Sequence, residues 1–145
     1  EQGCSQVMFL DAETGTYIEE LGGMNLFFVY KDGHVATPSL DGTILRGITR
    51  KSVIQLIQDR GIEIQERKIT LDEMRAGINS GEIVEVFACG TAAVITPVGQ
   101  FKSRVETIGS ADAEPGALTA SLREELTGIQ YGRVEDRHNW MLRLA

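Results

Sequence analysis

The chain has 145 residues, of which 42% are hydrophobic and 24% are charged, the composition of one soluble globular domain with a core of its own. Its formal net charge of −7 at pH 7 argues against nucleic-acid binding, because such proteins need a basic surface to displace counterions from phosphates. It contains no apolar run of the roughly 18 to 20 residues that span a membrane, and no signal-peptide pattern at its start.

Short apolar runs separated by turn residues predict a series of strands. Residues 6–10 (QVMFL) are expected to form a buried strand. Further strands are expected at residues 17–20, 26–30, 34–37, 62–69, 83–89 and 94–98. Lys31-Asp32-Gly33 predicts a hairpin turn, because Asp-Gly suits a turn that needs positive φ. Asp41-Gly42 marks another turn, and residues 99–112 have the polar composition of a loop.

Three segments combine helical spacing with helix-end signals. Val53 and Ile57 lie four apart and therefore share one helix face. Thr70 and Glu73 form a capping-box pattern at the start of a short helix. The expected helices run from Gly47-Ile48-Thr49 to Gly61, from Thr70 to Gly81 and over residues 116–130. Strands that alternate irregularly with three helices indicate an α/β or α+β sheet domain with its helices outside.

Two adjacent carboxylates, Glu19 and Glu20, precede the Gly22-Gly23 pair. In an extended strand neighbouring side chains point to opposite faces, so only one of the two can face the interior. A glutamate aimed inward needs a partner, and the glycines leave room for one to approach the backbone. The alternative is a strand, a turn and a second strand with both glutamates in water.

Two glycine-containing corners have the chemistry of an anion site. Gly47-Ile48-Thr49 opens a helix, whose first N–H groups and dipole favour a phosphate or a carboxylate. Gly90-Thr91-Ala92 interrupts a strand and offers close backbone approach and a hydroxyl group. Each alone could be only a helix cap or a strand bend. Together with an inward glutamate, they would suit a flat cofactor held at both ends, such as pyridoxal phosphate.

Five sequence blocks carry a family resemblance that covers nearly the whole chain in order. They are EQGC leading into QVMFLD, EELGGMNLFFV, ILRGITRKS, EVFACGTAAVITPV, and LTGIQYG at residues 126–132. With these blocks the chain resembles the C-terminal domain of the branched-chain amino acid aminotransferases, which are fold-type IV pyridoxal-phosphate enzymes. The resemblance implies a mixed sheet or pseudo-barrel with outer helices, and it implies that residues 1–145 form a cofactor-binding domain.

The resemblance also implies roles for individual residues. Glu20 would face the pyridine nitrogen of the cofactor and favour its protonated form, while Glu19 would point away. The expected cofactor-binding residues are Glu20, Gly47, Ile48, Thr49 and Thr91. Of these, Ile48 and Thr49 would bind the phosphate at the helix start, and Thr91 would add a further phosphate contact. The expected substrate-binding residues are Gly23, Thr91 and Ala92.

The chain departs from the family pattern in three places. Gly23 stands where many relatives have threonine, and Cys89 stands where others have serine, as an inert buried thiol or, if exposed, a reactive one. The Schiff-base lysine of the family lies N-terminal to the matched region, and none of the four lysines here occupies its motif. We therefore expect an N-terminal domain carrying that lysine to be absent from these residues, which would be inactive alone.

The implied activity is transfer of an amino group between leucine, isoleucine or valine and 2-oxoglutarate. Small-molecule partners would be branched-chain amino acids, 2-oxo acids and glutamate, with no nucleic acid and no membrane. The isolated cysteines and histidines predict no metal site, and reduced thiols indicate a cytoplasmic protein. A homodimer is expected from the resemblance. The alternatives are a D-amino acid aminotransferase or an aminodeoxychorismate lyase of the same fold type, or a binding module without catalysis.

Overall fold

Strand β3 (Met24–Tyr30) is the central strand of the structure, and its sequence accounts for that position. Its apolar residues from Leu26 to Val29 are all buried, as expected for a strand with both faces covered. The computed structural model describes residues 3–41, 43–142 and 144. Glu1-Gln2 of the first matched block and Gly42 of the expected Asp41-Gly42 turn lie outside those residues.

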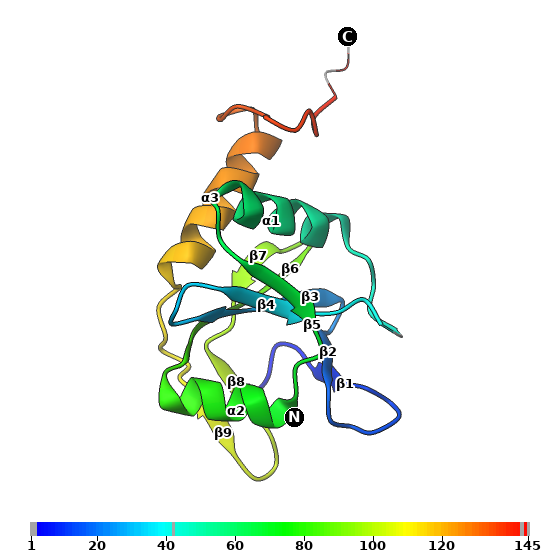
Figure 1. The fold of residues 1–145 in the computed structure, drawn as a ribbon, viewed down its shortest axis with the longest axis vertical. Helices are drawn as coiled ribbons and strands as arrows, with labels where there is room; N and C mark the ends of the chain where they lie inside the picture. Colours follow the sequence, from blue (N-terminus) through cyan, green and yellow to red (C-terminus); the bar gives the residue numbers. More distant parts are fainter. Residues whose placement is uncertain (1–2, 42, 143, 145) are drawn as a thin grey trace.

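Within the described residues, seven strands form one sheet, two more form a separate hairpin, and three helices lie outside the sheet (Figure 1). The strands of the sheet are β1 (Met8–Leu10), β2 (Ile18–Leu21), β3, β4 (Val35–Pro38), β5 (Ile64–Arg67), β6 (Ile83–Gly90) and β7 (Val94–Pro97). The hairpin is formed by β8 (Gln100–Lys102) and β9 (Thr107–Gly109). The helices are α1 (Ile48–Asp59), α2 (Leu71–Ser80) and α3 (Ala117–Gln130).

The two edges of β3 are paired differently. One edge pairs with β6 over nearly its whole length. The other edge pairs first with β2, where Glu20 lies opposite Asn25, and then with β4. At the point where β2 gives way to β4, the Thr37 hydroxyl donates to the Leu26 carbonyl at 2.7 Å and so satisfies a buried backbone acceptor. Since β4 and β5 run parallel and the other pairs antiparallel, the sheet is mixed.

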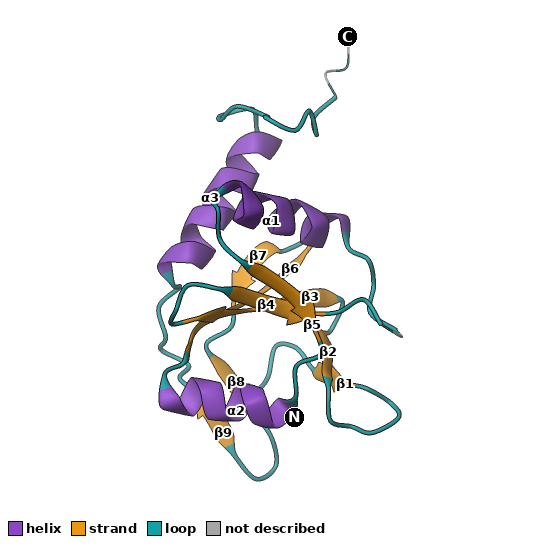
Figure 2. Cartoon of the chain, viewed as in Figure 1, coloured by secondary structure: helices purple, strands orange, loops and turns teal. Residues whose placement is uncertain are grey.

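Both faces of the sheet are covered (Figure 2). On one face α1 and α3 pack against an apolar cluster that includes Phe27 and Phe87, whose stacked rings lie 4.9 Å apart. On the other face α2 and the β8–β9 hairpin pack against Leu26 and Phe28. Alternate residues of β3 thus serve opposite cores, which confirms a mixed sheet with outer helices, the α+β arrangement.

The expected turn and cap chemistry is confirmed at several element ends. Gly33 has φ of 95° in the turn between β3 and β4, a conformation that glycine adopts without steric cost. Thr70 accepts a hydrogen bond from the Glu73 N–H at 3.0 Å and caps α2. Gly81 ends α2 in the left-handed region, as the sequence predicted.

Two expectations were wrong. The strand in residues 6–10 is not buried, because β1 is an edge strand whose Phe9 is 50% exposed. Residues 99–112 are not simply a loop, because they contain β8 and β9. Phe101 pairs with Ile108 in that hairpin and turns its apolar side toward the core. The Arg75 guanidinium of α2 binds Glu106 and holds the hairpin to the helix, a contact that local composition could not reveal.

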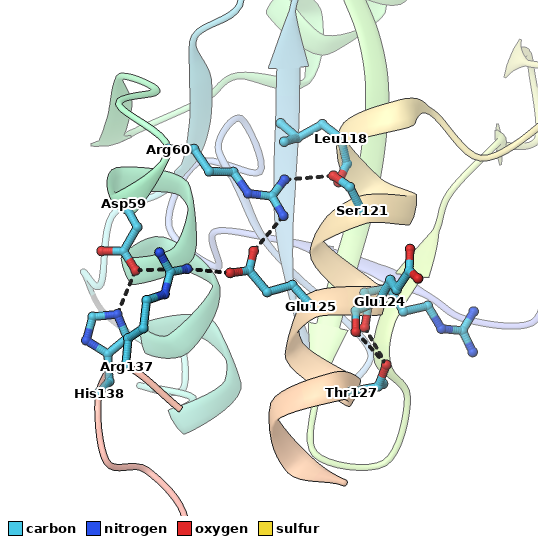
Figure 3. Close-up of polar contacts among 10 residues, drawn as sticks. Asp59, Arg60, Leu118, Ser121, Glu124, Glu125, Thr127, Arg137 and His138 are labelled. Atoms are coloured by element: carbon cyan, nitrogen blue, oxygen red, sulfur yellow. Dashed lines mark hydrogen bonds and ion pairs between the residues drawn. The ribbon is translucent and has the colours of Figure 1, made fainter. Parts of the chain in front are cut away.

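The C-terminal segment after α3 is fixed by charged side chains (Figure 3). Arg137 donates to Glu125 at 2.5 Å, and His138 Nε2 lies 2.6 Å from Asp59. Arg60 of the segment after α1 binds the same Glu125, so these contacts join α1, α3 and the segment. In the described ranges, no helix has the length and hydropathy needed to cross a membrane.

Candidate active site

The polar side chains of the sheet gather at the end of β3 that follows the β2–β3 turn. Glu20 on β2 is in register with Asn25 on β3, and Asn25 is in register with Cys89 on β6. Residues in register on paired strands point to the same face. The three side chains therefore share the face of the sheet that α1 and α3 cover, at the end where α1 begins.

A bulge in β2 falls at the two glutamates. Met8 pairs with Leu21 and Leu10 pairs with Ile18, so β2 has one residue more than β1 between these pairs. Ile18 and Leu21 consequently pack in the same apolar cluster although they are three positions apart. The strict alternation expected for this strand is wrong, because the extra residue interrupts it.

The two glutamates have different surroundings. The Glu19 carboxylate accepts a hydrogen bond from the Thr43 hydroxyl at 2.6 Å. Glu20 is half-buried, and within the described residues its carboxylate has no hydrogen bond or ion pair. A half-buried carboxylate without a partner can bind a cation or a hydrogen-bond donor from a ligand.

The N-terminus of α1 leaves backbone donors free. Its N-cap is Gly47, which provides no side-chain cap, and its first turn contains no acidic residue. Among the described residues, the N–H groups of Ile48, Thr49 and Arg50 have no acceptor. By contrast, the hydroxyl of Thr70 caps α2, and the Glu85 carboxylate accepts from two N–H groups of α3. Only α1, of the helices described, therefore presents an open positive end to an anion.

Asn25 links this helix end to the sheet. Its Nδ2 donates to the Leu45 carbonyl at 3.0 Å, in the segment just before α1. A Cβ atom on Gly47 would lie 2.6 Å from Asn25 Oδ1, so a larger residue could not take this position without a shift. The close approach explains the glycine and places the start of α1 beside the strand that faces Glu20.

The Gly90-Thr91-Ala92 corner lies beside the Gly22-Gly23 turn between β2 and β3. Thr91 and Ala92 are exposed in the turn between β6 and β7. A Cβ atom on Gly90, just before that turn, would lie 3.1 Å from Met24 Cγ and 3.7 Å from the Gly23 carbonyl oxygen. The turn is strained, because Val94 has φ of 59°, which is costly for a β-branched residue and common where a site fixes the backbone.

The site also includes two buried side chains, the charged guanidinium of Arg50 in the first turn of α1 and the thiol of Cys89 on β6. Arg50 is 4% exposed, and its guanidinium donates to the Pro38 carbonyl and to Glu66. Burial raises the pKa of Cys89 to about 12, with a smaller opposing effect from the positive charge of Arg50. Cys89 is therefore the inert, protonated thiol of the two possibilities, and it adds no negative charge to the site.

The structure thus brings the sequence-predicted residues to one end of the sheet, around the start of β3. Sequence reasoning missed Asn25 and Arg50. The signal for Asn25 was present, since an amide in the apolar run MNLFFV must be hydrogen-bonded if the strand is buried. The arrangement forms an open surface, because Ile48 at the start of α1 is 84% exposed. It can bind an anion at α1 and a hydrogen-bond donor at Glu20.

Residues 1–101 match the family described as amino-transferase class IV, and the chain belongs to that family. More particularly, it is 52% identical over 147 residues to the branched-chain-amino-acid aminotransferase of Mycolicibacterium smegmatis. The alignment covers 99% of this chain and 40% of that protein. It is 51% identical over 148 residues to the enzyme of the same name from Mycobacterium tuberculosis, again covering 40% of it.

Solved structures agree with the sequence relatives. The branched-chain amino acid aminotransferase of Escherichia coli superposes with a TM-score of 0.80 at 33% identity, over 97% of this chain and 43% of that one. The enzyme from Thermobaculum terrenum, solved in its PLP form, superposes with a TM-score of 0.78 at 33% identity, over 97% and 42%. The fold is that of these fold-type IV aminotransferases, and the chain spans about two fifths of the length of its relatives.

Proposed function

We propose that the chain is the cofactor-binding part of a pyridoxal-phosphate-dependent branched-chain amino acid aminotransferase. Its substrates would be leucine, isoleucine or valine and 2-oxoglutarate, with glutamate and branched 2-oxo acids as products. One observation supports this most directly: the unpartnered Glu20 carboxylate and the open N-terminus of α1 lie at the same end of one sheet face. The names of the relatives favour this activity over a D-amino acid aminotransferase or an aminodeoxychorismate lyase.

The residues present fit pyridoxal phosphate. Its phosphate is an anion, and α1 offers it the free N–H groups of Ile48 and Thr49 without a competing carboxylate. Gly47 has no side chain to obstruct the approach, and Thr91 could add a hydroxyl from the neighbouring turn. At the other end, Glu20 offers an acceptor for the protonated ring nitrogen.

When bound, the cofactor supplies an electron sink for the electrons released at the substrate α-carbon. Glu20 would hold the proton on the ring nitrogen by charge and hydrogen bonding, which favours the electron-withdrawing form. The start of α1 would bind and orient the phosphate. Backbone groups of Gly23, Thr91 and Ala92 would orient the substrate carboxylate. Each of these roles uses a group that lies at the end of the sheet where β3 begins.

We also propose that the lysine that moves the proton at the α-carbon comes from an N-terminal domain outside these residues. The lysines at positions 31, 51, 68 and 102 are all exposed, as solvated surface lysines are. The 145 residues would then be inactive alone. We propose a homodimer with a cytoplasmic location. We also propose that it has no nucleic-acid partner, and the net charge of −7 supports this last point.

The adjacent glutamates provide a matched test in the protein as it is encoded. Glu20→Gln removes the charge and keeps the size of the side chain, and it should lower kcat/KM for leucine by on the order of 10²-fold or more, the usual cost of losing a charge-stabilising group. Glu19→Gln, which alters only the contact with Thr43, should retain nearly full activity. Equal effects of the two substitutions, or no transamination of any branched-chain amino acid by the wild type, would contradict the proposal.

A further inference from the structure

Asn25 is a buried polar residue in an otherwise apolar stretch of β3. It is 6% exposed, and a buried amide is costly unless it is hydrogen-bonded. It lies in register between Glu20 and Cys89, on the face where α1 begins. Nothing in β3 itself requires an amide here, since the following residues are all hydrophobic. Its partners show what it does.

The amide of Asn25 bonds to the turn that leads into α1. Its Nδ2 donates to the Leu45 carbonyl at 3.0 Å, and the Gly47 N–H donates to the same carbonyl at 2.8 Å. That carbonyl thus joins the sheet to the last residue before the helix. The Gly47 carbonyl in turn accepts from the Lys51 N–H, which is the first hydrogen bond of α1. The contact is therefore continuous from β3 to the first helical turn.

Few other side chains fix this segment to the strands that carry the site. Among the described residues, Thr43 is bonded to Glu19 on β2, but that contact is exposed. Arg50 holds α1 to Pro38 and Glu66 at the ends of β4 and β5, which are not the strands that carry Glu20 and Asn25. Among the side-chain hydrogen bonds of the described residues, the part-buried bond from Asn25 to Leu45 is the one that joins the segment before α1 to β3.

We propose that Asn25 is a positioning residue that sets the spacing between Glu20 and the phosphate-binding N–H groups of α1. This role rests on the proposed function. Asn25 acts through the Leu45–Gly47 turn and is not assigned any contact with the cofactor. Without its bond, the helix start can move relative to the strand pair, and a ligand held at both ends loses one of its fixed points.

Two ligands distinguish positioning from general stability. Pyridoxal phosphate uses both ends of the site, whereas pyridoxal lacks the phosphate. In the protein as encoded, Asn25→Ala should weaken pyridoxal phosphate binding about tenfold, the equivalent of one hydrogen bond, and change pyridoxal binding less than twofold. Thr37→Val is the matched control, because it too removes one side-chain hydrogen bond to a backbone carbonyl, in this case the carbonyl of Leu26 on β3. It should leave the ratio of the two affinities unchanged.

Gly47→Ala tests the same contact from the other side. Its Cβ would lie 2.6 Å from Asn25 Oδ1, so it should separate the turn from β3 without altering the sheet. Because Gly47 itself lies where the phosphate would approach, this variant is tested by amide exchange in the ligand-free protein, which should accelerate severalfold at Lys51. If Asn25→Ala weakens both ligands equally, or weakens neither, or if Gly47→Ala leaves exchange at Lys51 unchanged, the positioning role is wrong.

Amide hydrogen exchange in the ligand-free protein provides a second readout that needs no cofactor. Asn25→Ala should accelerate exchange at Gly47 and Lys51, whose N–H bonds belong to the turn, by severalfold more than Thr37→Val does. Unchanged exchange there would overturn the inference. If the wild type binds neither ligand, the proposed function fails, while the exchange data still decide whether Asn25 fixes the start of α1.

Discussion

Gly116, the N-cap of α3, gives a prediction in which the backbone and the packing favour opposite results. Its φ of −66° and ψ of 160° suit any residue. Replacing glycine by alanine at such a position usually stabilises a protein by about 0.4–1 kcal/mol, because the unfolded chain loses freedom. Judged from the backbone alone, Gly116→Ala should therefore be favourable.

The packing predicts the reverse. A Cβ atom on Gly116 would overlap the Glu85 side chain, which is flexible enough to move aside. If it moves, it loses the N–H groups of Leu118 and Thr119 at 3.1 and 2.9 Å and the Thr119 hydroxyl at 2.7 Å. Loss of a helix cap costs about 0.5–2 kcal/mol, and loss of a negative charge at a helix N-terminus costs about 0.3–1 kcal/mol. Against the backbone gain, the net destabilisation is about 1 kcal/mol.

Denaturant unfolding of four proteins tests this reasoning: the wild type, Gly116→Ala, Glu85→Ala and the double variant. Gly116→Ala should lower the free energy of unfolding by about 1 kcal/mol, or roughly 2–4 °C in Tm for a domain of this size. In the Glu85→Ala background the overlap is gone, so the same change should be neutral or stabilising. The argument would be refuted if the Gly116→Ala single variant were as stable as the wild type or more stable. It would also be refuted if the substitution lowered the free energy of unfolding equally in both backgrounds.

Three further predictions concern ionisable groups. Burial, with a hydrogen bond to a carboxylate, raises the pKa of Tyr30 to about 12, so its phenolate absorbance should appear only near that pH; the stabilisation it provides is present below pH 10 and is lost as pH rises through about 12. The exposed Cys4 should react with a thiol reagent in the native protein, whereas Cys89, whose pKa burial raises to about 12, should react only in denaturant. A hydrogen bond from His138 lowers the pKa of Asp59. The stabilisation that this lowered pKa provides is present above the unfolded pKa of the carboxyl and is lost as pH falls through the lowered value. The single tryptophan stacks on His138, so its fluorescence should report release of the C-terminal segment in acid.

The features that the sequence predicted are those that local residues determine. The buried run of β3, the Gly33 turn and the Thr70 cap each depend on neighbours within a few positions. The bulge in β2 could not be predicted in this way, because it is defined by the pairing of Ile18 and Leu21 with another strand. The strict alternation assumed for this strand failed for that reason, since Ile18 and Leu21 lie in the same apolar cluster.

The site was predictable in its parts but not in its connections. The resemblance supplied residues such as Glu20 and Thr91, and the structure places them at one end of the sheet. The amide of Asn25 indicated a buried hydrogen bond, but its partner Leu45 lies 20 positions away and could not be predicted, and the role of Asn25 follows from that contact. Arg50 was missed for the same reason, since Pro38 and Glu66 meet it only in the folded chain.

The helix ends explain why the proposed anion site lies at α1 rather than at α2 or α3. Each of the three described helices begins with N–H groups that need an acceptor. The chain supplies one to α2 through Thr70 and to α3 through Glu85, and both helices lie against the sheet with those donors satisfied. At α1 it supplies Gly47 instead, and it uses Asn25 to hold the turn before the helix rather than to cap the helix. A side-chain cap at α1 would stabilise the helix and occupy the donors that a phosphate requires. The absence of a cap is thus the physical condition for the proposed binding of pyridoxal phosphate.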